Sequence, residues 1–290
     1  MTKVVKKISE LRKTLLEYYK KGKSVGFVPT MGALHIGHLE LIKKAKQQND
    51  IVVVSIFVNP LQFGPKEDFN KYPRPIKQDI YLCKKQKVNF IFIPTVKEMY
   101  PEGKSSTKIH INKYCNILCD RFRPGHFDGV ATVVAKLFNI VRPTKAYFGE
   151  KDYQQLLIVK QLVNDLNFDI KIIACPIVRE KDGVACSSRN KYLKKQERKF
   201  ANVIYKSLLY CKQLILSRNF KISDCISKSK IFINSHINVP HKIQYFEVYD
   251  ENLIPVYNNP KNILPGTKIR IFIAVYIGKT RLIDNIGFVM

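Results

Sequence analysis

Short runs of β-branched and aromatic residues alternate with helical patterns over the first 180 residues. The runs lie at 24–30, 51–58, 90–93, 146–148 and 169–175. Apolar residues at helical spacing lie between them, for example over 130–141 and 156–166. Strands that are apolar along their whole length are typical of a parallel sheet covered by helices on both faces. The sequence therefore predicts an α/β fold.

Two further segments of this part are interpreted from local pattern. Val4, Val5, Ile8 and Leu11 recur at helical spacing, so the chain is expected to open with an amphipathic helix. The segment KIHI at 108–111 alternates and is expected to form a strand.

The pattern changes after about residue 177. Two long helical stretches, near 194–216 and 222–236, precede three apolar runs that lie close together in sequence, at 243–250, 269–277 and 281–286. Closely spaced strands favour an antiparallel arrangement. We therefore expect two domains, 1–177 and 178–290, the second one smaller and of α+β type.

The chain is strongly basic, with a formal net charge of +27 over 290 residues. Lysines are scattered through every segment and do not form one stripe, which favours a solvated surface over a dedicated polyanion site. We therefore expect no specific nucleic acid partner. A basic nucleic-acid-binding protein stays as an alternative, and it would bind with a steep dependence on salt.

The N-terminal segment MTKVVKKISELRK has no continuous apolar stretch and no small-residue cleavage site, so no secretion signal is expected. The longest apolar runs are strand-sized, whereas a membrane-spanning helix needs about 20 apolar residues. Seven irregularly spaced cysteines without a CxxC pair are typical of free thiols in a reducing compartment. These features predict a cytoplasmic protein without a membrane partner.

Residues 30–38, TMGALHIGH, stand where a strand is expected to turn into a helix. Ligands of open α/β sheets bind at the carboxyl ends of the strands, where helix N-termini offer N–H groups to phosphates. His35 and His38 are three residues apart and share one face of the first helical turn. Gly32 and Gly37 let a nucleotide approach the backbone. This HxGH pattern predicts a nucleotide site, and two incidental surface histidines are the alternative.

Three more segments carry polar groups suited to an anionic or small polar ligand. In FGEKDYQQ (148–155), Lys151 can neutralise phosphate charge. In CSSRN (186–190), two hydroxyls stand beside a guanidinium, which together can cradle an anion. In NPLQFG (59–64), Gln62 offers both a donor and an acceptor. Each segment alone is equally typical of capped helices and loops.

Taken together, seven segments resemble the pantothenate synthetase family, in order and through nearly the whole chain. They are PTMGALHIGH, SIFVNPLQFG, YPR, RPGHFDGV, FGEKDYQQ, DGVACSSRN and RLIDN. The resemblance implies a Rossmann-like nucleotidyltransferase domain followed by a smaller, lid-like domain. It also implies a cytoplasmic enzyme, usually a homodimer, that uses ATP and Mg²⁺ to join pantoate to β-alanine.

The resemblance assigns roles to individual positions. His38 would be the catalytic proton donor, with His35 and Lys151 beside it on the phosphates. The ATP pocket would be lined by Met31, Gly32, Ala33, Leu34, His35, Ile36, Gly37, His38, Gly149, Glu150, Lys151, Asp152, Val178, Cys186, Ser187, Ser188 and Arg189.

Substrate and metal roles follow in the same way. Gln62 would bind both pantoate and β-alanine, and Gln155 would bind pantoate. Asp79 matches a family carboxylate near the metal. Cys186 departs from the family pattern, which usually has Leu or Met at this position, so packing near the ATP site would be looser.

The chemistry implied is adenylation of the pantoate carboxylate, followed by attack of the β-alanine amine. A second member of the same HxGH group, an adenylyltransferase that acts on a phosphate acceptor, would use the same histidines. It would not require Gln62 and Gln155 together. Its product would be dinucleotide-like, whereas the ligase releases AMP and an amide.

Overall fold

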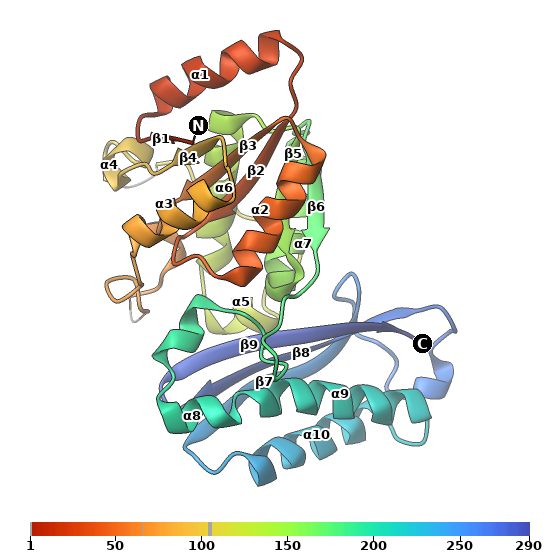
Figure 1. Ribbon diagram of the computed structural model, residues 1–290. Coiled ribbons are helices and arrows are strands. Elements are labelled where there is room, and N and C mark those ends of the chain that lie inside the picture. Colours follow the sequence, from red (N-terminus) through yellow and green to blue (C-terminus); the bar gives the residue numbers. More distant parts are fainter. Residues whose placement is uncertain (1, 66, 104–105) are drawn as a thin grey trace. The chain divides into compact units, whose positions relative to one another are not determined.

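The computed structural model describes residues 2–65, 67–103 and 106–290. The chain divides into two compact units (Figure 1). The first comprises Met1–Glu150 and Gln154–Pro176, and the second comprises Lys151–Tyr153 and Ile177–Met290. The two domains expected from the sequence, 1–177 and 178–290, stay a prediction. That prediction did not include Lys151–Tyr153 in the second unit.

A six-stranded sheet of parallel strands forms the centre of the first unit, in the order β1-β4-β3-β2-β5-β6. The strands are β1 (Lys3–Val5), β2 (Val25–Thr30), β3 (Ile51–Ile56), β4 (Phe90–Phe92), β5 (Lys145–Gly149) and β6 (Lys171–Cys175). Every residue of β3 is buried, as expected for a strand covered on both faces. The predicted Rossmann-like α/β fold is confirmed.

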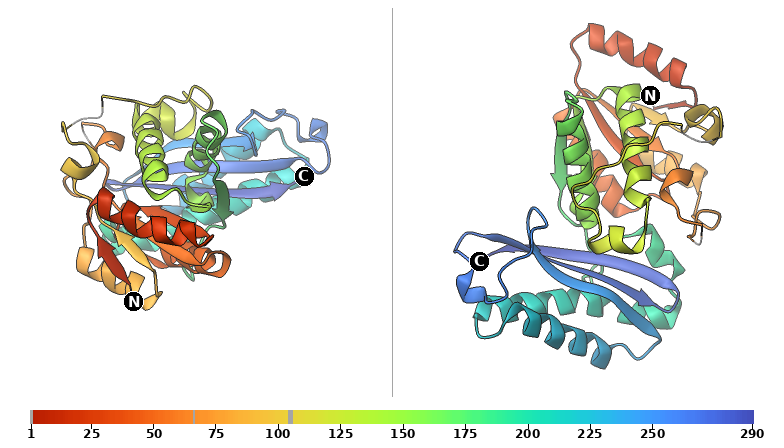
Figure 2. Two further views of the ribbon diagram at one scale, coloured as in Figure 1. Left: turned by 90° about the horizontal axis from the view of Figure 1, so that it is seen from above. Right: turned by 180° about the vertical axis from the view of Figure 1, so that it is seen from behind.

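Helices cover both faces of this sheet. Along this part of the chain the helices are α1 (Ile8–Lys20), α2 (Ile36–Gln48), α3 (Ile76–Lys85), α4 (Val96–Met99), α5 (Leu118–Phe122), α6 (His126–Val141) and α7 (Tyr153–Asp165), with short 3-10 turns η1 (Pro60–Gln62) and η2 (Glu150–Asp152). Figures 1 and 2 show α2 and α3 on one face, and α6 and α7 on the other. Among the described residues, no helix is long and apolar enough to cross a membrane.

The strand order determines where a ligand can bind. The chain runs from β2 to β3 to β4 in one direction and then returns to β5 on the other side of β2. In doubly wound sheets this reversal opens a crevice outside the carboxyl ends of the two strands. The segments that follow β2 and β5 are those singled out from the sequence, TMGALHIGH and GEKD.

Two local predictions in this unit are wrong. Val4 and Val5 lie in β1, where they pair with Ile91 and Phe92 of β4 in parallel register, and the helix begins only at Ile8. Pairing with a distant strand thus outweighs a helical spacing that two β-branched residues only weakly support. Residues 108–111 form no strand, because the N–H of Ile109 donates to the Thr132 hydroxyl at 3.0 Å instead of to a neighbouring strand.

The second unit contains a three-stranded antiparallel sheet, β7-β8-β9, as the sequence predicts. Helices α9 and α10 pack on it (Figure 1) and enclose a separate apolar core. The elements are η3 (Ser188–Tyr192), α8 (Lys195–Phe200), α9 (Asn202–Ser217), α10 (Ile222–His236), β7 (His241–Asp250), η4 (Pro260–Asn262), β8 (Lys268–Ile277) and β9 (Thr280–Val289).

Candidate active site

The loop after β2 has an unusual backbone that its own residues stabilise. Gly32 and Ala33 are both in the left-handed region, at φ +82° and +50°. The Thr30 hydroxyl accepts from the N–H of Gly32 at 3.1 Å and donates to the Ser55 carbonyl at 2.8 Å. A Cβ atom on Gly32 would lie 2.9 Å from Oδ2 of Asp79. Only glycine therefore fits where the loop passes over that carboxylate.

Asp79, in the first turn of α3, supports this loop and is completely buried. Its Oδ2 accepts from the N–H of Ala33 at 2.9 Å, and its Oδ1 accepts from the N–H of Leu34 at 2.8 Å. Hydrogen bonds to a charged acceptor are among the strongest in proteins. Both carboxylate oxygens thus serve the loop, and the role of Asp79 near a metal stays a prediction.

His35 and His38 stand at the start of α2 with their rings 4.1 Å apart. Nδ1 of His35 accepts from the N–H of Gly37 at 3.2 Å, and Nδ1 of His38 accepts from the N–H of His35 at 3.3 Å. An imidazole nitrogen that accepts carries no proton, so each neutral ring is protonated at Nε2. The two rings therefore cap the N-terminus of α2.

Gln62 lies in η1, directly after β3, and is 7% exposed. Its side-chain oxygen accepts from Nδ2 of Asn59 at 3.3 Å, and its Nε2 lies 2.9 Å from the sulfur of Met31. Oδ1 of Asn59 in turn accepts from the hydroxyl of Tyr100 at 2.9 Å. Because β2 and β3 are adjacent, the loops that follow them bring Met31 and Gln62 together.

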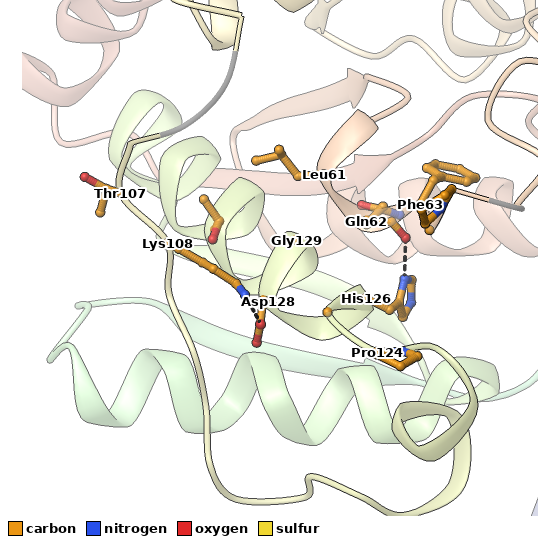
Figure 3. Close-up of a pocket in the computed structure, with 13 residues that line it drawn as sticks. Leu61, Gln62, Phe63, Thr107, Lys108, Pro124, His126, Asp128 and Gly129 are labelled. Carbon is orange, nitrogen blue, oxygen red and sulfur yellow. Dashed lines mark hydrogen bonds and ion pairs between the residues drawn. The ribbon is translucent and has the colours of Figure 1, made fainter.

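The segment RPGHF holds the backbone of Gln62. Nδ1 of His126 donates to the Gln62 carbonyl at 2.7 Å (Figure 3), and Nη1 of Arg123 donates to Nε2 of His126 at 2.9 Å. Arg123 also pairs with Glu67 at 2.6 and 2.7 Å. Burial alone would raise the pKa of Glu67, but the Arg123 guanidinium outweighs it, and the pKa lies below the usual value. A chain of charge-assisted contacts therefore fixes this loop, which entered the sequence analysis only as one of the seven segments that carry the family resemblance.

A cavity of about 290 Å³ adjoins the same loop (Figure 3). The side chain of Gln62 lies at one end, and the Lys108–Asp128 ion pair, at 2.7 Å, lies at the other. Burial tends to raise the pKa of Asp128, but hydrogen bonds from Lys108 and His110 lower it below its ordinary value. The cavity is polar at both ends and large enough for a small zwitterion.

The segment after β5 contains two adjacent glutamines with different surroundings. Gln154 is 5% exposed and binds the loop before α5, accepting from the N–H of Cys119 at 2.9 Å and donating to the carbonyls of Tyr114 and Ile117 at 3.0 Å. Gln155 is half-buried. The family resemblance assigns a role to Gln155 alone, whereas the structural role of Gln154 depends on long-range contacts that no local pattern reveals.

In the second unit, Val178 and Cys186 face each other across a tight turn, with the N–H of Cys186 donating to the Val178 carbonyl at 2.9 Å. Beyond the turn, Ser187 caps the N-terminus of η3, because its hydroxyl accepts a hydrogen bond from the N–H of Arg189 at 3.3 Å. Burial raises the pKa of the Cys186 thiol, which disfavours the nucleophilic thiolate form. Ser188 is also buried.

The predicted site residues thus lie in both units. Those in the first are Met31, Gly32, Ala33, Leu34, His35, Ile36, Gly37, His38, Gln62, Asp79, Gly149, Glu150 and Gln155; those in the second are Lys151, Asp152, Val178, Cys186, Ser187, Ser188 and Arg189. In the second, Nζ of Lys151 is 3.9 Å from Asp152 and its side chain is 18% exposed. Within the described ranges, no three His, Cys, Asp or Glu side chains gather as a metal-binding cluster.

Comparison with known proteins identifies the family. Residues 3–287 match the family model described as pantoate-beta-alanine ligase. The chain belongs to the pantoate–β-alanine ligase family. As a member it is a ligase of pantothenate biosynthesis, and the fold described above is the family's fold.

Individual relatives match along nearly their whole length. The chain is 49% identical to the pantothenate synthetase of Caldicellulosiruptor bescii over 283 residues, which is 98% of both chains. The crystal structure of pantothenate synthetase from Thermus thermophilus superimposes with a TM-score of 0.88 at 41% identity, covering 99% of both chains. The Francisella tularensis pantoate-beta-alanine ligase, solved with beta-gamma ATP and beta-alanine, has a TM-score of 0.79 at 40% identity and covers 99% of this chain and 97% of its own.

Proposed function

We propose that this chain joins pantoate to β-alanine through a pantoyl-adenylate intermediate, with release of AMP and pyrophosphate. The observation that carries the proposal is the loop after β2, where Asp79 holds Ala33 and Leu34 and the two helix-capping histidines follow. Such a helix N-terminus attracts phosphate. The Francisella tularensis relative, solved with beta-gamma ATP and beta-alanine, supports the same substrates here.

In the first step a carboxylate oxygen of pantoate attacks the α-phosphorus of ATP. A new O–P bond forms, the bond from the α-phosphorus to the bridging oxygen breaks, and pyrophosphate leaves with both electrons. Negative charge shifts onto the leaving group, so the protein contributes mainly positioning and charge neutralisation. His35, His38 and Lys151 would supply the neutralising donors, with Ser187, Ser188 and Arg189 completing the anion cradle.

In the second step the neutral amine of β-alanine attacks the acyl carbon of the adenylate. The C–N bond forms, the C–O bond breaks with its electron pair leaving on AMP, and the nitrogen, positively charged after the attack, loses one proton to water. Adenylation provides the leaving group that a free carboxylate lacks, so no covalent enzyme intermediate is needed. Gln62 would bind both pantoate and β-alanine, and Gln155 would bind pantoate.

The remaining positions would shape the nucleotide pocket. Backbone groups of Met31–His38 and Gly149–Asp152 would contact ATP, together with Val178 and Cys186. Mg²⁺ enters as the complex with ATP, since it prefers phosphate oxygens and water and needs few protein ligands. Asp79 would act on that complex through the loop it holds. We further propose a homodimer located in the cytoplasm.

The decisive experiment measures AMP release from ATP and Mg²⁺ with pantoate, in the presence and absence of β-alanine. Sustained AMP release that requires both pantoate and β-alanine, with an equal amount of amide product, is the expected result. Formation of a dinucleotide-like product from a phosphate acceptor would support the related adenylyltransferase instead. No AMP under any combination, from protein with native circular dichroism, would exclude the acyl-adenylate mechanism.

A further inference from the structure

Strand β9 carries two polar residues, Asp284 and Asn285, for which the proposed chemistry has no role. They are 4% and 1% exposed. Burying a carboxylate and an amide destabilises a fold unless both are fully paired. The hydrogen-bond partners of these two side chains therefore indicate which segments they hold in place. The partners described below all belong to the second unit.

Asn285 binds the segment that carries Lys151. Its Nδ2 donates to the main-chain carbonyl of Lys151 at 3.0 Å, and its Oδ1 accepts from Nη1 of Arg270 at 2.5 Å. The Arg270 guanidinium in turn lies 3.7 Å from the ring centroid of Tyr153, whose hydroxyl donates to the carbonyl of Glu251 at 2.9 Å. Asn285 thus holds the backbone of Lys151 directly and the residue two positions later through Arg270.

Asp284 binds the turn that precedes Ser187–Arg189. Both its oxygens accept from Arg179, at 2.6 and 3.0 Å. The same guanidinium donates to the Gly183 carbonyl at 3.0 Å and to the Asn285 carbonyl at 3.1 Å. It also lies 3.8 Å from the ring centroid of Tyr205. The planar guanidinium of arginine has five N–H donors, so Arg179 can bind two carbonyls and one carboxylate at the same time.

We propose that Asp284 and Asn285 are positioning residues that connect the two phosphate-binding segments of the second unit, Lys151–Tyr153 and the turn leading to Ser187–Arg189. The inference rests on the proposed function. The adjacent residues meet at Arg179, which binds the side chain of one and the carbonyl of the other. Lysine has a long, flexible side chain, so a fixed backbone limits the region its ammonium group explores. Misplacement of a group by about 1 Å can lower a rate about 10²-fold.

The test is Asn285→Asp, which preserves shape and the acceptor for Arg270 but replaces the donor facing the Lys151 carbonyl with an oxygen. We expect adenylate formation, measured as pantoate-dependent exchange of pyrophosphate into ATP, to fall roughly 10- to 100-fold in kcat. KM for pantoate is expected to change far less. The matched control is Asn234→Asp on α10, an exposed asparagine of the same unit, which should leave the exchange rate unchanged.

A double-mutant cycle with Lys151→Ala separates positioning from general destabilisation. If Asn285 acts through Lys151, then Asn285→Asp adds less than about threefold in the Lys151→Ala background, because coupled residues are not additive. Independent effects that multiply, or wild-type kinetics of Asn285→Asp, would overturn the proposal. If Asn285→Asp does not fold, the same double-mutant cycle is done with Arg270→Lys. That change keeps the positive charge but removes the planar guanidinium that stacks on Tyr153, and the same results support or overturn the proposal.

Amide hydrogen exchange of residues 150–155 provides a readout that does not depend on catalysis. In the absence of substrates, the variant is expected to exchange roughly tenfold faster in this segment, because the segment opens more often once its backbone contact is lost, while β7 and α9 are unchanged. Equal exchange in variant and wild type would contradict the positioning role. Loss of AMP formation by the wild type would instead refute the proposed function, so the two failures are distinguishable.

Discussion

The Oδ2 atom of Asp79 accepts a 2.9 Å hydrogen bond from the N–H of Ala33, a residue in the left-handed region at φ +50°. The second oxygen of the same carboxylate accepts from the next amide, that of Leu34. Two consecutive amides therefore share one buried charge. This relationship explains how the loop retains a strained backbone directly before the helix that carries both histidines.

Replacing Asp79 with Asn is expected to destabilise the protein by roughly 1–3 kcal/mol, because one backbone N–H would face an NH₂ group. KM for ATP should also rise, because the loop that carries the histidines would be less firmly held. Urea unfolding and steady-state kinetics measure the two effects, with the exposed Asp169→Asn as control. Rescue of activity by higher Mg²⁺ concentration, with unchanged stability, would show that the carboxylate serves the metal instead of the loop.

Gly32→Ala tests the close approach of the loop to Asp79. The new Cβ would lie 2.9 Å from Oδ2 of Asp79 and 2.9 Å from Cγ2 of Ile56, at a φ of +82°. Gly22→Ala is the matched control, since Gly22 has a φ of +66° but no atom within 4 Å of the added Cβ. We expect the control to lose about 1 kcal/mol by backbone strain alone. Gly32→Ala should lose more and also lose ATP affinity; equal losses in chemical denaturation would argue against the steric explanation.

If the proposed roles hold, His38→Ala and Lys151→Ala each remove a donor from developing phosphate charge, and each is expected to lower the rate of adenylate formation by about 10²–10³. Circular dichroism should stay native, because neither change removes buried apolar contacts. His236→Ala at the end of α10 is a control outside the site. Near-normal turnover of either purified variant would remove that residue from the mechanism.

Gln62→Ala should raise KM for pantoate and for β-alanine more than KM for ATP. The amide side chain is buried between Asn59 and Met31 and borders the cavity that ends at the Lys108–Asp128 ion pair, so its loss acts first on that cavity. Initial-rate kinetics with each substrate varied in turn measure the effect, with the exposed Gln196→Ala as control. A selective loss of ATP affinity would mean that the substrate pocket is assigned to the wrong residues.

Asp50 is expected to make stability depend on acid pH. Hydrogen bonds from the Ser24 side chain and backbone, and then from Lys23, lower the pKa of Asp50 to about 2. A carboxylate with a depressed folded-state pKa stabilises the fold above its unfolded pKa, and this contribution is lost as pH falls through the folded-state value. The difference in Tm between wild type and Asp50→Asn should therefore be present at pH of about 6 and shrink below pH of about 4, near the unfolded pKa of an aspartate. A difference that stays constant with pH would contradict the assignment.

Local pattern in the sequence was sufficient for most of the architecture. The continuous apolar run at 51–58 indicated a buried strand, the β-branched run at 169–175 indicated a further strand, and helical spacing over 130–141 indicated α6. The same reasoning failed at Val4–Val5, where pairing with β4 decided the conformation. It failed again at 108–111, where a single bond to Thr132 replaced a strand ladder.

The sequence by itself determined the fold class and the family, and it picked out the segments predicted to carry the chemistry, because these depend on residue order and periodicity along the chain. Only the tertiary structure showed what holds those segments in place. Asp79 lies 46 residues from Ala33, and Asn285 lies 134 residues from Lys151. Contacts of this kind have no period and no local composition. They arise when strand order brings distant loops together, and buried polar groups must then find partners among whatever the fold has placed beside them.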